Sequence, residues 1–252
     1  MRELQPSAVK WNRMLAILCC VAAGLWLAGT VLRVVGYESD FGEWLYEAFF
    51  WNPDILLEIA SIFIFACYLV GNICVNKWPL LAVLAIGFWV LSSEGINLYM
   101  MIIGLILYGQ SFSGYDMVYI LCFALGILAV ISVLCGMTKF RWFAVAWMAY
   151  QLWIQVRVFI WNIADLLYYV EKYPLSGIDR ICSYIEPILF CLVLLLFFVR
   201  NRIPALIKPA AKAKKKSLPP EKALRALKGD YEFGLLSAEE YAAARQEILA
   251  KL

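Results

Sequence analysis

The sequence predicts an all-α, polytopic membrane protein of six transmembrane helices, paired as three hairpins and followed by a cytoplasmic helical-hairpin tail. Hydrophobic residues make up 64% of the 252-residue chain and charged residues 16%, whereas a soluble domain is about half apolar and about 25% charged. Six apolar runs are each long enough to cross a bilayer. Basic residues gather in alternate connections. The chain therefore divides into a membrane domain (1–202), a basic linker (203–217) and the tail (218–252).

The first hairpin is predicted at residues 14–35 and 53–75. Its first segment carries Gly24 and Ala28 at a spacing that favours close helix contact. Arg33 lies near the end of that segment, where its long side chain can reach the interface. The connection 36–54 holds five acidic residues and no basic one, and its aromatic residues 43–51 favour a short interfacial helix.

The second hairpin is predicted at residues 79–107 and 116–137. Residues 79–107 exceed the roughly 20 residues that span a bilayer. This segment is therefore tilted, extends beyond the bilayer, or breaks at the polar stretch 92–95, which contains Glu94. Residues 109–114, rich in glycine and serine, connect the two segments.

The third hairpin is predicted at residues 142–170 and 181–199, and polar residues interrupt its first segment. At about 100° per residue, several of them fall within roughly 80° on one helix face. They are Gln151, Gln155, Asn162, Asp165 and Tyr169. Because unpaired polar groups are costly in hydrocarbon, this segment is expected inside the bundle. Residues 171–180 are expected to form a loop.

Charged residues inside the membrane are expected to pair with each other. Counted from the tryptophans that mark the inner interface, Glu94 and Arg157 lie at nearly equal depth, and Arg157 points about 120° away from the polar face. This predicts adjacent third and fifth helices with a Glu94–Arg157 pair. The same measure predicts that Arg33 pairs with Asp165 near the outer interface. These four charged residues, with Gln151, Gln155 and Asn162, are the seven candidate buried polar or ligand-binding residues of the membrane domain.

The distribution of basic residues predicts the orientation. Connections assigned to one side carry Arg2, Lys10, Arg13, Lys77, Lys139, Arg141, Arg200 and Arg202. The opposite connections carry Lys172 and Arg180. The positive-inside rule therefore places both termini in the cytoplasm. Residues 200–216 contain seven basic and no acidic residues, so anionic inner-leaflet lipid is expected to attract them by about 1 kcal/mol per charge.

The three hairpins share a pattern. Asp54, Asp116 and Asp179 open the even-numbered segments, and a basic residue follows each of them 23 positions later. A true internal repeat would produce this pattern. Any three hairpins that obey the charge rule would also produce it.

The tail is predicted to be two short amphipathic helices. Leu224, Leu227 and Tyr231 share one face of the first helix, and Gly234 suits its C-terminal cap. A capping box from Ser237 to Glu240 begins the second helix, whose apolar face carries Tyr241, Ile248 and Leu249.

These tail residues, together with the stretches 234–237 and 239–241 and Arg245, resemble the SHOCT domain, a short C-terminal domain of bacterial proteins. The resemblance covers about 30 residues of the tail, and no family is recognised in the membrane domain. It implies a bacterial protein and a small module for contacts with a partner or a second copy of the chain. The residues expected to make such contacts are Leu224, Leu227, Gly234, Ser237, Glu240, Tyr241 and Ile248.

The composition argues against an enzyme. The chain has no histidine, and its eight cysteines form no C-x-x-C pair, so we expect no catalytic, cofactor or metal site. Nucleic acid is not an expected partner. Two functions remain: an adaptor or scaffold that acts through its tail, and a small transporter subunit or channel that uses polar residues of the third and fifth helices. Aromatic content of 15% and an acidic outer side suit a cation or a flat amphipathic ligand.

Overall fold

A computed structural model of the chain describes residues 4–36, 53–74, 78–109, 111–137, 140–201, 206 and 220–250. Six helical segments in these ranges are long and apolar enough to cross a membrane, which confirms the predicted fold class. They are α1 (Pro6–Gly36), α3 (Pro53–Gly71), α4 (Pro79–Val90) continued by α5 (Ile96–Leu107), α6 (Gly114–Leu134), α7 (Arg141–Trp161) and α9 (Pro174–Arg200). The predicted interfacial helix at 43–51 and most of the basic linker lie outside the described residues.

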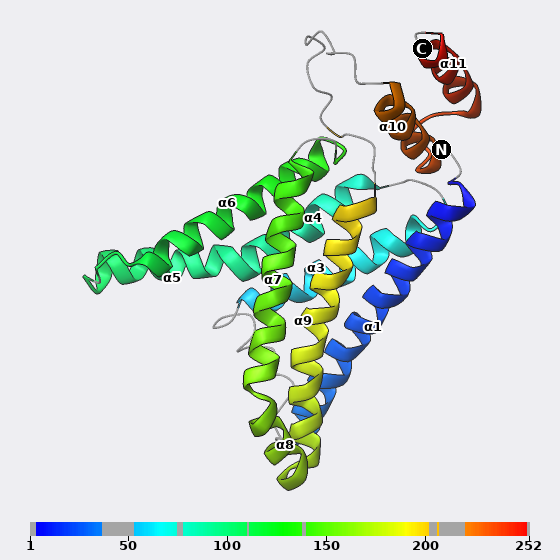
Figure 1. Cartoon of the computed structure of the whole chain (residues 1–252). Helices are drawn as coiled ribbons and strands as arrows, with labels where there is room; N and C mark the ends of the chain where they lie inside the picture. The colour runs from blue at the N-terminus through cyan, green and yellow to red at the C-terminus, as the bar shows by residue number, and fades with distance from the viewer. Residues whose placement is uncertain are drawn as a thin grey trace.

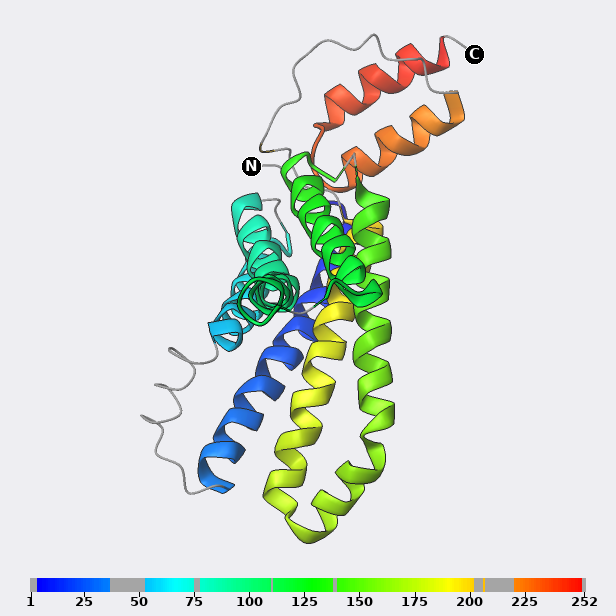
Figure 2. The same cartoon turned by 90° about the vertical axis from the view of Figure 1, so that its left-hand side faces the viewer.

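The helices gather at one end of the molecule and spread apart toward the other. α9 lies between α1 and α7, and these three run side by side (Figure 1). α3 packs against α1 and α4. The hairpin of α5 and α6 projects away from the three long helices and is seen nearly end-on in Figure 2. We call the end beside the tail the tail end and the opposite end, where α7 leads into α9, the distal end.

Aromatic side chains fill the core where α3, α4 and α9 meet. Phe65 is edge-on to Phe197 at 5.1 Å between ring centroids, and Trp89 is edge-on to Phe190 at 4.8 Å. Such pairs contribute about 0.5–1.5 kcal/mol each beyond their buried area. Because lipid is as apolar as these rings, packing geometry holds the helices together rather than the hydrophobic effect alone.

The third span contains a π-helical turn, η1 (Leu91–Gly95), between α4 and α5. The polar stretch 92–95 therefore widens the helix instead of ending it. Ser92 and Ser93 donate hydrogen bonds to the carbonyl of Trp89, at 3.0 and 2.7 Å. These bonds satisfy polar side chains that would otherwise face hydrocarbon.

The fifth predicted segment is not one straight helix, and this corrects the prediction. α7 ends at Trp161, and a separate helix, α8 (Ile163–Lys172), follows after a bend at Asn162. The Asn162 side chain donates to the carbonyl of Val158 at 2.8 Å, and such local bonds compete with regular helix geometry.

The predicted loop 171–180 is also largely helical, because α9 already begins at Pro174. Proline suits the first turn of a helix, where its missing N–H is not needed. α8 and α9 then cross so closely that a Cβ on Gly177 would lie 2.5 Å from Val170 Cα. Glycine at 177 is therefore required for this turn.

The close approach of α1 to its neighbours lies at a different glycine from the one predicted. No described atom lies within 4 Å of a Cβ built on Gly24, and Gly24 and Ala28 are both exposed, so the described residues do not make the expected close contact there. At Gly29, by contrast, a Cβ would lie 3.3 Å from both Asp179 Oδ1 and Cys182 Cβ. α1 and α9 are in contact at this glycine.

The tail forms the predicted helical hairpin, α10 (Pro220–Glu232) and α11 (Ala238–Leu249). Gly234 has a φ of 67°, and the capping box between Ser237 and Glu240 is present. The rings of Tyr231 and Tyr241 stack at 4.6 Å between the two helices. These features confirm the local prediction for the tail.

The tail touches the start of the chain. The Gln5 N–H donates to the Glu232 carbonyl at 3.2 Å, and Phe233 packs against Leu4 and Ala8. The described start of α1 and the tail hairpin therefore lie at the same end of the molecule (Figure 1).

Candidate functional site

The π-helical turn places a carboxylate in the interior of the membrane domain. Glu94 is 3% exposed. Its Oε1 accepts hydrogen bonds from Trp147 Nε1 at 3.3 Å and from Gln151 Nε2, both on α7. Neutral donors from another helix therefore satisfy this carboxylate, although an isolated buried charge would be very costly.

The predicted Glu94–Arg157 pair is wrong, although the third and fifth spans do meet at Glu94. The Arg157 side chain is exposed, and its guanidinium lies 4.0 Å from the Trp161 ring centroid and 5.4 Å from that of Trp153. Contacts of this kind stabilise a cation at an aromatic surface by about 0.5–2 kcal/mol. Tryptophan rings therefore take the place of the expected carboxylate.

Glu94 borders a polar cleft of about 400 Å³ between η1, α5, α6 and α7. Hydroxyl, amide and thiol groups line it together with the carboxylate. They belong to Ser93, Asn97, Tyr115, Tyr119, Cys122, Tyr150, Gln151 and Gln155. The cleft therefore offers one negative charge, several neutral hydrogen-bonding groups and three aromatic rings. It has the size and mixed lining of a small-molecule site.

The predicted polar face of the fifth segment is divided by the bend at Asn162. Gln151 is buried and Gln155 half-buried, and both line the cleft. Asp165 lies beyond the bend on α8 and is exposed. Asn162 bonds within its own helix. The structure therefore brings Gln151 and Gln155 together with Glu94, and leaves Asn162 and Asp165 out of the site.

Arg33 pairs with Asp179 rather than with the predicted Asp165. Its Nε and Nη2 donate to the two carboxylate oxygens of Asp179, each at 3.3 Å, and Nη2 also donates to Ser183 at 3.1 Å. Asp179 is on α9 and buried. The sequence did not predict Asp179 as the partner of Arg33, because residues 171–180 were expected to form a loop. Its only sequence signal was its place as the third of three regularly spaced aspartates.

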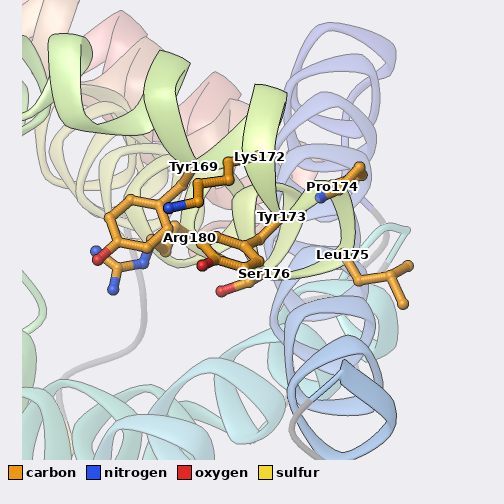
Figure 3. A pocket seen from close by; sticks show the side chains of 7 residues that line it. All are labelled: Tyr169, Lys172, Tyr173, Pro174, Leu175, Ser176 and Arg180. Atoms are coloured by element: carbon orange, nitrogen blue, oxygen red, sulfur yellow. The ribbon is translucent and has the colours of Figure 1, made fainter.

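A second hollow, of about 590 Å³, lies at the distal end where α8 meets α9 (Figure 3). Arg180 lies 3.7 Å from the centroid of the Tyr169 ring, and Lys172 lies over the rings of Tyr168 and Tyr173 at 5.4 and 5.3 Å. Hydrogen bonds to Tyr168 and then Tyr173 raise the pKa of Lys172 above its ordinary value. Both cations therefore lie against tyrosine rings at this end of the molecule, Lys172 exposed and Arg180 half-buried.

Metal-binding side chains are not grouped in the described part of the chain: no three His, Cys, Asp or Glu residues there are placed to hold a metal ion.

The fold and the site together define an α-helical, multi-pass integral membrane protein. Comparison of the chain with protein families, with curated proteins and with solved structures finds no match.

Proposed function

We propose that this protein binds a small cationic amphipathic molecule in the cleft beside Glu94, as a small transporter subunit or channel. The observation that carries the proposal is a buried carboxylate on the wall of a polar cleft inside a membrane domain. Ionisable groups at such positions mark substrate or ion pathways more often than not. Glu94 also lies in a π-helical turn, a feature frequent at functional sites.

The chemistry of the cleft defines the ligand class. The carboxylate attracts a positive charge, and Tyr115, Tyr119 and Tyr150 offer ring faces to a flat or cationic group. The amides of Gln151 and Gln155 can donate or accept hydrogen bonds. A ligand with a positive head and a compact apolar body fits these groups.

Binding of benzyltrimethylammonium to the purified protein tests this proposal, with uncharged neopentylbenzene as the matched control. At 100 times its Kd, the cation should stabilise the fold by about 2.7 kcal/mol. Glu94→Gln should remove that stabilisation, whereas Asp165→Asn, which changes an exposed carboxylate, should not. Equal effects of the charged and uncharged compounds, or an unchanged response in Glu94→Gln, would show that Glu94 serves only to position helices.

The tail supports a second function, that of an adaptor or scaffold. Within α10 and α11 as described, no side chain is fully buried, and Leu224, Leu227 and Ile248 are half-buried. A hairpin this small buries too little apolar surface to be very stable alone. With the SHOCT resemblance, this favours contacts between the tail and a second copy of the chain.

Leu227→Asp tests the tail, with Lys222→Asp on the exposed side of α10 as control. We expect Leu227→Asp to reduce crosslinking between copies in membranes at least tenfold and Lys222→Asp to leave it unchanged. If both variants crosslink like the original protein, the tail does not join copies of this chain.

We also propose that the protein lies in a bacterial inner membrane with both termini in the cytoplasm. The positive-inside rule supports this orientation. The contact between Gln5 and Glu232 supports a common side for the start and end of the chain. In this orientation, anionic inner-leaflet lipid is expected to attract the basic residues of the linker sequence.

A further inference from the structure

A separate polar cavity of about 130 Å³ lies between α1, α3 and α9, away from the Glu94 cleft. Two carboxylates from different helices line it, Glu58 on α3 and Glu186 on α9. Neither was singled out as a site residue from the sequence. The cavity is large enough for a partly hydrated ion, because one water needs only about 10–15 Å³ by this measure.

One oxygen of these carboxylates has no hydrogen-bond partner among the described residues. Glu186 is 3% exposed, and no described residue donates a hydrogen bond to its Oε1. A buried carboxylate oxygen without a donor is strongly unfavourable, and a proton, a bound cation or ordered water compensates it. Glu186 therefore indicates that the cavity holds something positive or hydrogen-bonding.

The positive side chain at the cavity does not supply that compensation. Arg33 also lines the cavity, but both of its carboxylate contacts go to Asp179. This pair is close to neutral as a unit, which leaves the charges of Glu58 and Glu186 unbalanced. Asp54, one turn before Glu58 on α3, adds further negative potential.

Apart from the Trp26 indole, the remaining polar side chains at the cavity carry oxygen atoms. Thr30 and Ser183 contribute hydroxyl groups, each of which donates to a backbone carbonyl. The Ser183 hydroxyl also accepts from Arg33, so it keeps one lone pair free, whereas the Thr30 hydroxyl keeps both. Pro187 has no N–H, so the Ser183 carbonyl loses its usual helical donor. Carboxylate, hydroxyl and carbonyl oxygens form the ligand set that hard cations prefer.

We propose that this cavity binds a small hard monovalent cation of the size of Na⁺, held between the carboxylates of Glu58 and Glu186. A monovalent ion fits better than a divalent one because, among the described residues, no third acidic side chain joins Glu58 and Glu186 in a metal-binding group. The bound ion links α3 to α9 beside the Arg33–Asp179 pair. This inference does not rest on the proposed ligand cleft.

Thermal unfolding of the full-length protein in NaCl and in N-methyl-D-glucamine chloride, at equal ionic strength and neutral pH, tests the site. We expect Na⁺ to raise Tm saturably and the bulky, hydrophilic N-methyl-D-glucamine cation to have no such effect. Glu186→Gln should weaken the Na⁺ response at least tenfold. Asp165→Asn should retain it. If Glu186→Gln does not fold, Thr30→Val is measured in its place. This variant removes a hydroxyl without adding bulk, and it should weaken the response of Tm to Na⁺ several-fold.

Three results would overturn the proposal. Na⁺ and N-methyl-D-glucamine could have equal effects. Stability could depend on pH alone and not on Na⁺, which would mean that Glu58 and Glu186 hold a proton instead of a cation. The other ionisable groups near this pair are Asp54, Asp179, Arg33 and the thiols of Cys19 and Cys191. Ca²⁺ could stabilise at far lower concentration than Na⁺. Because Glu186→Gln leaves the Glu94 cleft intact, benzyltrimethylammonium binding should persist, which separates the two proposals.

Discussion

The ion pair between Arg33 and Asp179 should respond asymmetrically to mutation, because its two members differ in burial. The Asp179 side chain is 4% exposed and the Arg33 side chain 40%. Arg33→Met leaves a buried carboxylate without its cation, whereas Asp179→Asn leaves a cation that can still reach solvent. Breaking a buried pair costs about 3–5 kcal/mol. We expect Arg33→Met to lower the free energy of unfolding by about 3 kcal/mol, the lower end of this range, and Asp179→Asn to lower it by about 1 kcal/mol.

The measurement is the free energy of unfolding in mixed micelles for both single variants and the double variant. Because the double variant removes both charges, it should be more stable than the sum of the single losses predicts, with a coupling of about 1–2 kcal/mol. Arg180→Met is the matched control, since this α9 arginine lies on the Tyr169 ring rather than on a carboxylate. It should cost less than about 1 kcal/mol. Equal losses for the two single variants, or strictly additive losses, would refute the reasoning.

Two further predictions follow from the fold. Gly177→Ala should destabilise the protein by about 1–3 kcal/mol because the added methyl group meets the Val170 backbone. Gly24→Ala, the control, should be neutral. Equal unfolding temperatures for the two variants would contradict the close crossing of α8 and α9. In a cysteine-free background, Ser111→Cys between α5 and α6 should react with a membrane-impermeant thiol reagent in intact cells, and labelling only after lysis would reverse the proposed orientation.

The membrane spans and the tail could be predicted from the sequence because their signals are local. A long apolar run has few alternatives to a membrane helix, since every backbone group must be satisfied within it. The tail was specified by caps: Gly234 takes the left-handed conformation that favours glycine, and Ser237 and Glu240 satisfy each other's backbone. Such features depend on a few neighbouring residues.

The fifth predicted segment failed because hydropathy does not detect a bend. The apolar pattern continues through Asn162, so a straight helix was assumed and Asp165 was placed on the same face as Gln151. One side-chain bond, from Asn162 to Val158, accompanies the end of α7. Beyond that point the face assignment from ideal helix geometry no longer holds.

The partner of Glu94 was mispredicted for a related reason. Depth along a helix gives one coordinate, but pairing also requires the direction in which each side chain points. A π-helical turn holds about one residue more than a regular turn, so it shifts the faces of the residues around Glu94. Gln151 was assigned to the inward face of the fifth helix, and it is the residue that donates to Glu94. The prediction that Gln151 faces the bundle interior was correct, whereas the predicted partner of Glu94, Arg157, was wrong.

Glu94 and Glu186, the buried carboxylates at the two proposed sites, therefore predict opposite consequences of ligand loss. Glu94 already accepts hydrogen bonds from Trp147 and Gln151, so its cleft is stable when empty, and an incoming cation competes with a neutral amide. Glu186 has an oxygen to which no described residue donates, so the cation we propose there would contribute to folding itself. A ligand at Glu94 can thus exchange without loosening the helices. Removal of the cation beside Glu186 should weaken the packing of α1, α3 and α9.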